Sequence, residues 1–172
     1  RQNINDKTPL GLKVKELIDK GMFCPDDLTV EIVKDRLKKP DCRNGYLLDG
    51  FPRNLFQAKA LETFSPPDKV IDISVGLDKI ERRITGRRVC SKCKESFHID
   101  FIGETSVCPN CKGTLVIRED DNKEAAKERL KVYKEQTEPL IGYYAEQNKL
   151  FTVDGEKDVD SVFLEIEKVL DK

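Results

Sequence analysis

The apolar residues of the chain fall into short, separate groups whose spacing switches between the periods of helices and strands. The segment 8–21 has a capping residue and a proline at its start, an apolar stripe at helical spacing and a glycine at its end, which predicts a helix. Behind Pro25, residues 26–39 carry a second apolar stripe that stops before Pro40, where a helix cannot continue. Two helices are therefore expected in this part of the chain, over 8–21 and 26–39.

Two apolar runs in the middle of the chain have the length and the flanking turn residues of buried strands. They are GYLLDG (45–50) and KVIDISV (69–75), and a helix near 54–64 is expected between them. A strand, a helix and a strand in succession predict parallel pairing of the two strands. The expected later elements are a helix near 78–86, a helical stretch at 122–148 bent or split near Pro139, a strand at 150–155 and a closing helix with Val159, Val162, Phe163, Ile166 and Leu170 on one face. This alternation predicts an α/β fold.

Four of the six cysteines are clustered in one segment. Cys90, Cys93, Cys108 and Cys111 form the pattern C-x2-C-x14-C-x2-C, which is close to that of zinc ribbons, and four thiolates close a tetrahedral zinc site. The alternatives are two disulfides or idle thiols. Residues 88–118 are too short to build an apolar core of their own, so a structural zinc would replace it. With sulfur at all four positions no ligand site is left for water, which argues against a catalytic metal.

The remaining candidates for metal or thiol chemistry have simpler interpretations. His98 is expected to pack in this segment or lie at its surface, because four cysteines already complete the ligand set. Cys24 and Cys42 are expected to be small, partly buried thiols.

Composition restricts the class of protein. The 172 residues suit one domain with an inserted subdomain, and 31 Lys and Arg nearly balance 32 Asp and Glu. A near-neutral chain has no global basic field for binding nucleic acid. No apolar run approaches the ~20 residues that span a bilayer, and there is no basic and apolar leader. We expect a cytoplasmic monomer that binds neither membranes nor nucleic acid.

Arginines follow the predicted strands and flank the cysteine segment. Ligands of open α/β sheets bind beyond the carboxyl ends of the strands, and Arg53 in DGFPRN (49–54) projects from a stiff loop at such a place. Arg118 and Arg129 are eleven residues apart, about three helical turns, so both can face one cleft. Guanidinium groups bind phosphate through two bonds. The other arginines of this set are Arg82, Arg83, Arg87 and Arg88.

Several of these segments together resemble a known family. GYLLDGFPRN (45–54), TGRRVC (85–90) with the later cysteines, IREDD (117–121), ERLKVYKEQTEPLIGYY (128–144) and TVDG (152–155) follow one another as in adenylate kinases of the long form with a zinc-binding lid. The resemblance covers essentially the whole chain. It implies a parallel sheet of the P-loop type flanked by helices, with residues 1–86 and 119–172 as the core, an AMP-binding arm at about 1–39 and a lid at 87–118. It also implies reversible phosphoryl transfer from MgATP to AMP, which gives two ADP.

The resemblance further implies roles for single residues. On the AMP side they are Arg1, Met22, Phe23, Cys24, Gly50, Phe51, Pro52, Arg53 and Gln57, with Gln57 reading the adenine edge. On the ATP side they are Arg83, Arg87, Ser96, Phe97 and the main-chain carbonyl of Lys157. Arg118 and Arg129 would gather the phosphates of both substrates, so the expected catalytic set is Arg53, Arg87, Arg118 and Arg129. Asp49, Asp120 and Asp121 match acidic positions near magnesium or the lid arginines.

The chain departs from the family pattern in three places. Lys-Leu-Val is more usual at 22–24, Tyr is more usual at Phe97, and the glycine-rich loop with a Gly-Lys pair that cradles ATP phosphates does not occur. We therefore expect a fragment of a longer gene product, with little kinase activity by itself. The other hypotheses are a non-catalytic nucleotide-binding fragment and a zinc-ribbon module that binds nucleic acid through the basic segment 81–94. A kinase of UMP or CMP is disfavoured by the lid type and by Gln57.

Overall fold

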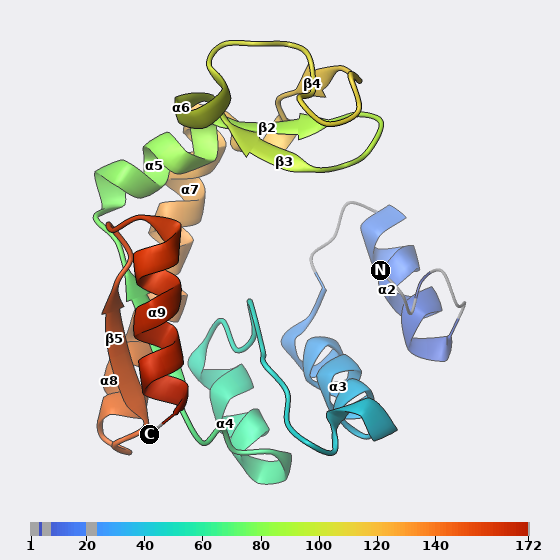
Figure 1. The fold of residues 1–172 in the computed structure, drawn as a ribbon. Coiled ribbons are helices and arrows are strands. Elements are labelled where there is room, and N and C mark those ends of the chain that lie inside the picture. The colour runs from blue at the N-terminus through green and yellow to red at the C-terminus, as the bar shows by residue number, and fades with distance from the viewer. Residues whose placement is uncertain (1–3, 5–7, 20–23, 172) are drawn as a thin grey trace. The chain divides into compact units, whose positions relative to one another are not determined.

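A computed structural model gives the fold of residue 4, residues 8–19 and residues 24–171, with the backbone alone at Ile18, Asp19 and Asp120. The chain divides into two compact units, residues 1–68 and 69–172, and each is described by itself. Figure 1 shows the order of the elements along the chain.

The first unit is helical, as the sequence predicts. It contains α2 (Pro9–Asp19), α3 (Asp26–Leu37), a short 3-10 turn (Pro40–Cys42) and α4 (Leu55–Phe64). The start of α4 is fixed by Asn54, whose side-chain oxygen accepts a hydrogen bond from the Gln57 N–H at 2.9 Å. Helix α3 packs against α4, where Ala58 and Leu61 are fully buried. The three helices expected in this part of the chain are thus confirmed.

The strand predicted at 45–50 is wrong. These residues have no regular secondary structure, and Leu47 is 76% exposed. A single strand leaves its N–H and C=O groups unpaired, so it persists only beside another strand. Among the described residues of this unit none forms a strand that could pair with it. The apolar run is therefore an extended connection between the 3-10 turn and α4.

The second unit contains the parallel sheet. Strand β1 (Val70–Ser74) pairs in parallel with β5 (Leu150–Asp154), in a register that runs from Val70 opposite Leu150 to Ser74 opposite Asp154. Helices α8 (Pro139–Ala145) and α9 (Val159–Leu170) pack against β5 (Figure 1). Both strands were predicted, but β1 pairs with β5 and not with 45–50. The α/β class, with a parallel sheet flanked by helices, is confirmed.

The helical stretch predicted at 122–148 is split. Helix α7 (Lys123–Val132) passes into a π-helical turn (Tyr133–Thr137), and α8 begins at Pro139. Pro139 has no N–H to donate, and the preceding N–H of Glu138 reaches back five residues to the Tyr133 carbonyl at 2.9 Å. The predicted interruption near Pro139 is confirmed, and its form is a widened turn.

The closing helix α9 buries only part of the predicted face. Val162, Ile166 and Val169 are half-buried, whereas Val159 is 77% exposed and Phe163 is 58% exposed. Residues four and seven positions after Val162 share its face, but Phe163 lies about 100° further round the helix. The predicted stripe is therefore confirmed at Val162 and Ile166 and wrong at Val159, Phe163 and Leu170, the last of which is 52% exposed. Within residues 4, 8–19 and 24–171, no helix has both the length and the apolarity needed to cross a membrane.

Lys69 fixes the end of α9 from the start of the sheet. Its ammonium donates to the carbonyls of Val169 at 2.7 Å and Leu170 at 3.2 Å, which lie in the last turn of the helix. A cation there satisfies carbonyls that have no partner within the helix and interacts favourably with the helix dipole. We expect Lys69→Met to lower the free energy of unfolding by about 1–2 kcal/mol in urea titrations. Lys168→Met, which removes an exposed lysine from the same turn, is the control and should change it by less than about 0.5 kcal/mol.

The cysteine segment forms a small antiparallel sheet of its own within the second unit. Strand β2 (Arg87–Cys90) lies between β3 (Ser96–His98) and β4 (Leu115–Val116), and α6 (Ile99–Ile102) follows β3. Helix α5 (Leu77–Thr85) leads into β2, and a 3-10 turn (Glu119–Asp121) leads from β4 to α7. The buried core of this sheet consists of Cys90, Cys108 and Leu115. Val89 on β2 is buried as well, so two of the four buried residues described in this segment are cysteines, in keeping with a segment too short for an apolar core.

Candidate functional site

The four clustered cysteines bring their sulfur atoms together. The Sγ atoms of Cys90, Cys93, Cys108 and Cys111 all lie within 4.8 Å of one another. Cys90 Sγ lies 3.4 Å from Cys111 Sγ, and Cys93 Sγ lies 3.8 Å from Cys108 Sγ. None of the four forms a disulfide. The disulfide alternative is therefore excluded for this structure, and the cluster could hold a metal ion.

The surroundings of the sulfurs fit such an ion. A tetrahedron with metal–sulfur bonds of about 2.3 Å has edges of about 3.8 Å, which the two sulfur–sulfur distances approach. The N–H groups of Cys93 and Lys92 donate to Cys90 Sγ, each at 3.4 Å, and lower the pKa of the Cys90 thiol. Gly113 leaves room beside them, because a Cβ there would lie 3.0 Å from Cys90 Sγ. A thiol that ionises more easily, in an uncrowded cluster, favours metal binding.

A buried carboxylate gathers three arginines at the end of this segment. Asp121, 1% exposed, accepts two hydrogen bonds from the Arg87 guanidinium, one of them from Nε at 2.8 Å. The nearest Arg129 nitrogen lies 3.6 Å from Asp121 Oδ1. The hydrogen bond from Arg87 lowers the pKa of Asp121, and the charges of Arg118 and Arg129 add to the effect. Two of the four arginines expected to act on phosphate, Arg87 and Arg129, therefore lie beside one anionic side chain, and the charge of Arg118 acts on it as well.

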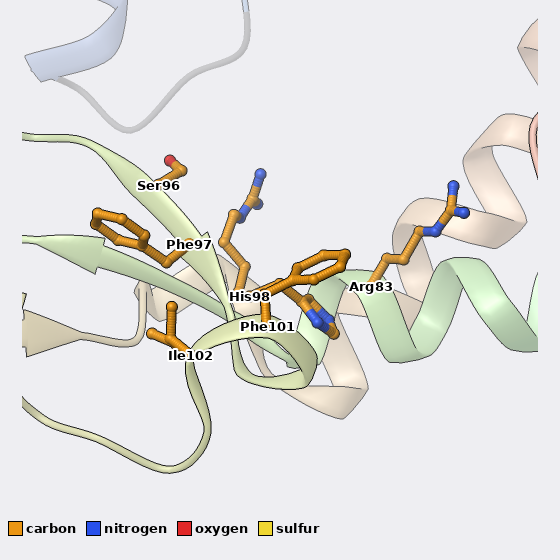
Figure 2. A pocket seen from close by; sticks show the side chains of 7 residues that line it. Arg83, Ser96, Phe97, His98, Phe101 and Ile102 are labelled. Carbon is orange, nitrogen blue, oxygen red and sulfur yellow. The ribbon is translucent and has the colours of Figure 1, made fainter. Parts of the chain in front are cut away.

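Beside this cluster lies a pocket of about 380 Å³. Its lining includes Arg83 from α5, and Figure 2 shows the rings of Phe101 and His98 side by side in it. Their ring centres are 6.2 Å apart, and Phe101 is 85% exposed. The full lining is Arg83, Arg87, Ser96, Phe97, His98, Phe101 and Ile102. The exposed ring of Phe101 together with guanidinium groups suits a ligand that has a flat base and an anionic group.

Gly86 sets the distance between α5 and this pocket. His98 packs over it, so that a Cβ on Gly86 would lie 2.2 Å from His98 Nε2. The Gly86 carbonyl also accepts a hydrogen bond from the Ile99 N–H at 3.0 Å. This close approach is possible because glycine has no side chain.

We expect Gly86→Ala to displace His98, lower the free energy of unfolding by about 1–3 kcal/mol and weaken ligand binding in the pocket. Gly142→Ala is the control, because a Cβ there meets nothing within 4 Å and alanine favours a helix. Urea titrations of both variants would show opposite signs. Equal stability of the two variants would contradict the role assigned to Gly86.

The DGFPRN loop is folded back on itself within the first unit. Gly50 has φ +73°, which favours glycine, and the Arg53 Nε donates to its carbonyl at 2.8 Å. The Phe51–Pro52 peptide bond is cis, and Phe51 is buried. Arg53 N–H donates to Gln57 Oε1 at 2.7 Å. The loop thus holds Gly50, Phe51, Pro52, Arg53 and Gln57 in one compact group, and their expected contact with AMP stays a prediction.

Comparison with known proteins identifies the family. A family model described as adenylate kinase matches residues 1–149. The chain is 51% identical, over 177 aligned positions, to an adenylate kinase of Clostridium tetani. The alignment covers 99% of this chain and 82% of that relative. The chain belongs to the adenylate kinase family. It is also 48% identical to an adenylate kinase of Clostridium acetobutylicum (99% of this chain, 82% of the relative) and 43% identical to one of Methanocella arvoryzae (100% and 83%).

In this member of the adenylate kinase family the structure unites most of the residues expected on the ATP side. Arg83, Arg87, Ser96 and Phe97 all line the same pocket. Lys157 is not among its lining residues, and its ammonium pairs with Glu165. The sequence analysis does not predict Phe101 or Ile102 as site residues. Phe101 could have been found, because it is an aromatic residue three positions after His98 in the predicted metal-binding segment.

The residues expected on the AMP side lie in the first unit. Cys24 is half-buried and accepts a hydrogen bond from the Thr29 hydroxyl at 3.4 Å, and Cys42 is also half-buried, so the expectation for both thiols is confirmed. Arg1, Met22 and Phe23 lie outside the described residues, as does the side chain of Asp120. Asp49 is exposed. Convergence of Arg53 with the arginines of the second unit stays a prediction.

Proposed function

We propose that this adenylate kinase family member catalyses reversible phosphoryl transfer from MgATP to AMP, which gives two ADP. The observation that carries the proposal is the pairing of Arg87 and Arg129 with the buried Asp121, beside a pocket that contains the exposed ring of Phe101. Phosphoryl transfer needs little covalent chemistry from a protein. It needs fixed positive charge on the transferred group and exclusion of water.

The pocket of the second unit is the proposed ATP site. Phe97 and Phe101 offer ring faces to the base, and Arg83 is held in place by its hydrogen bond to the Gly155 carbonyl at 2.9 Å. Arg87 is the guanidinium proposed to contact the ATP phosphates. Its guanidinium donates hydrogen bonds to Asp121, so its orientation is set before substrate arrives. Ser96 and the main-chain carbonyl of Lys157 complete the proposed set.

The DGFPRN loop is the proposed AMP site. Arg53 would bind the AMP phosphate, and Gln57 would read the adenine edge. Gly50, Phe51 and Pro52 form the stiff loop that carries Arg53. The residues from Arg1 and from 22–24 complete the proposed site, and Arg118 and Arg129 contact the phosphates of both substrates.

The four cysteines are proposed to hold a structural zinc in a lid formed by residues 87–118. A metal at a site with four sulfur ligands supplies folding energy, about 10–16 kcal/mol in small zinc domains, and no open position for chemistry. Arg87 and Arg118 stand at the two ends of this segment. We propose that the lid closes over ATP and keeps water from the transferred phosphoryl group. Magnesium enters as the MgATP complex.

The test is ADP formation from MgATP and AMP by the full product of the gene, followed beside UMP and CMP as acceptors. We expect AMP to be the preferred acceptor by a large factor. Preference for UMP or CMP would overturn the choice of substrate. Salt-dependent RNA binding without turnover would overturn the proposal as a whole. Size-exclusion chromatography would check the expected monomer, and fractionation of cells would check the expected cytoplasmic location.

A further inference from the structure

The side chain of Gln57 is held by hydrogen bonds on both of its polar atoms. Oε1 accepts from the Arg53 N–H at 2.7 Å, and Nε2 donates to Asp26 Oδ1 at 2.7 Å. Gln57 is 6% exposed, and all three residues lie in the first unit. The side chain therefore has one fixed position and one fixed orientation.

The orientation follows from the chemistry of its partners. A backbone N–H only donates, so the atom that faces Arg53 must be the amide oxygen. An ionised carboxylate only accepts, so the atom that faces Asp26 must be the amide nitrogen. If the amide were flipped, its NH2 group would face the N–H of Arg53, so that two donors would meet. Its oxygen would face the carboxylate of Asp26, so that two acceptors would meet. Both contacts would then be lost together.

Each polar atom of Gln57 keeps the capacity for one more bond. The amide nitrogen carries a second hydrogen, and the oxygen has a second lone pair. An amide in this orientation presents an acceptor and a donor side by side. A 6-aminopurine offers the matching pair, since its amino group donates and its ring nitrogen N1 accepts. A 6-oxopurine offers the reverse pair, because its oxygen accepts and N1 carries a hydrogen.

The geometry points to Asp26 as the positioning residue that makes the acceptor site select 6-aminopurine over 6-oxopurine nucleotides, by blocking the flip of Gln57. This inference rests on the proposed function, since it concerns the base of the phosphoryl acceptor. Asp26 is itself fixed, because its second oxygen accepts from Asn54 Nδ2 at 2.9 Å. Asn54 also caps α4, the helix that carries Gln57. The N-termini of α3 and α4 are thus joined through one carboxylate.

The experiment compares AMP with IMP as acceptors for the full gene product and for Asp26→Ala. The two nucleotides differ at the 6-position and at the proton on N1. We expect Asp26→Ala to lower the ratio of kcat/KM for AMP to that for IMP by about tenfold or more, because loss of one charge-assisted hydrogen bond makes the flipped amide accessible. The KM for ATP should stay unchanged. A purely structural role would lower kcat/KM for both acceptors equally.

Asp27→Ala is the matched control. Asp27 is an exposed acid in the same first turn of α3, so this variant removes the same charge from the same helix end. Its AMP to IMP ratio should equal that of the unmodified protein. If Asp26→Ala does not fold, the nearly isosteric Asp26→Asn is tested in its place. We expect this variant to lower the ratio of kcat/KM for AMP to that for IMP by a smaller factor. An unchanged ratio in the folded variant overturns the inference, whereas failure of the unmodified protein to phosphorylate AMP overturns the proposed function instead.

Discussion

Replacing Arg87 by alanine is expected to lower kcat for ADP formation by about a thousandfold or more. The group that neutralises a transferring phosphoryl group contributes on this scale when it is an arginine. Arg87 lines the pocket proposed for ATP and is oriented by Asp121, so its guanidinium is in position before substrate binds. Initial rates with saturating MgATP and AMP measure the effect. Arg87→Lys should retain part of the activity, because it keeps the charge but loses the planar fork.

Arg88→Ala is the matched control for this prediction. Arg88 follows Arg87 on β2, and its guanidinium donates to the carbonyls of Thr85 at 3.1 Å and Arg87 at 2.8 Å. It is not a lining residue of the ATP pocket. We expect its kcat to stay within about tenfold of the unmodified protein. Equal losses in the two variants would show that general positive charge on β2 matters, and the specific role of Arg87 would be wrong.

Measurements of stability separate the structural role of Arg87, its ion pair with Asp121, from its proposed catalytic role. Its removal leaves the buried carboxylate of Asp121 with the Arg129 guanidinium 3.6 Å away, and breaking a buried pair costs about 3–5 kcal/mol. Arg87 itself is 28% exposed, so the loss should fall at the low end of that range. The double variant Arg87→Ala with Asp121→Asn should recover part of this stability and none of the activity. Recovery of both would contradict a catalytic role.

The same pair predicts how stability depends on pH. The pKa of Asp121 is lower in the folded protein, chiefly because of the hydrogen bond from Arg87. Its contribution is therefore fully present above the unfolded pKa of about 4 and is lost as the pH falls through the folded value. The difference in stability between the unmodified protein and Arg87→Ala should be largest near pH 7 and should shrink at pH 3. Urea titrations at both values measure it.

Local signals explain which elements the sequence predicts well. Helices α2, α3 and α8 begin at or directly behind a proline, and α4 has Asn54 as its cap, so their starts depend on neighbours in the sequence. The strand expected at 45–50 failed because a strand exists only through its partners. The run has the composition of a buried strand, yet Leu47 is largely exposed. Composition indicates what a segment favours, and tertiary contacts decide what it becomes.

In the candidate site, too, local patterns could be predicted and contacts between distant residues could not. The cysteine cluster was predictable, because two C-x-x-C pairs at one spacing describe a local structure that folds round one ion. The arginines could be found as residue types, but the burial of Asp121 between them depends on the meeting of β2 and α7 in space. A motif predicts Gln57 as a binding residue, whereas Asp26, which accepts its hydrogen bond, lies 31 positions away. No local pattern signals such a contact.

Removal of the metal should have the largest effect on stability. Among the described residues of the cysteine segment only Val89, Cys90, Cys108 and Leu115 are buried, so little apolar burial remains to hold it once no metal joins the four sulfurs. We expect Cys108→Ser to abolish metal binding, to unfold residues 87–118 in the native protein and to lower the melting temperature by more than about 10 °C. Metal content per chain, melting curves and amide hydrogen exchange in the segment measure these three effects.

Cys42→Ser is the control, because it removes a half-buried thiol that lies outside the cluster and contacts Arg36. It should keep the metal, and its melting temperature should change by a few degrees at most. The rest of the second unit should survive in Cys108→Ser, since β1 and β5 pair without help from the cysteine segment. Hydrogen exchange should therefore rise in 87–118 and stay slow in β1 and β5. Slow exchange throughout the metal-free variant would mean that the antiparallel sheet is stable without an ion, and that the cysteines serve another purpose.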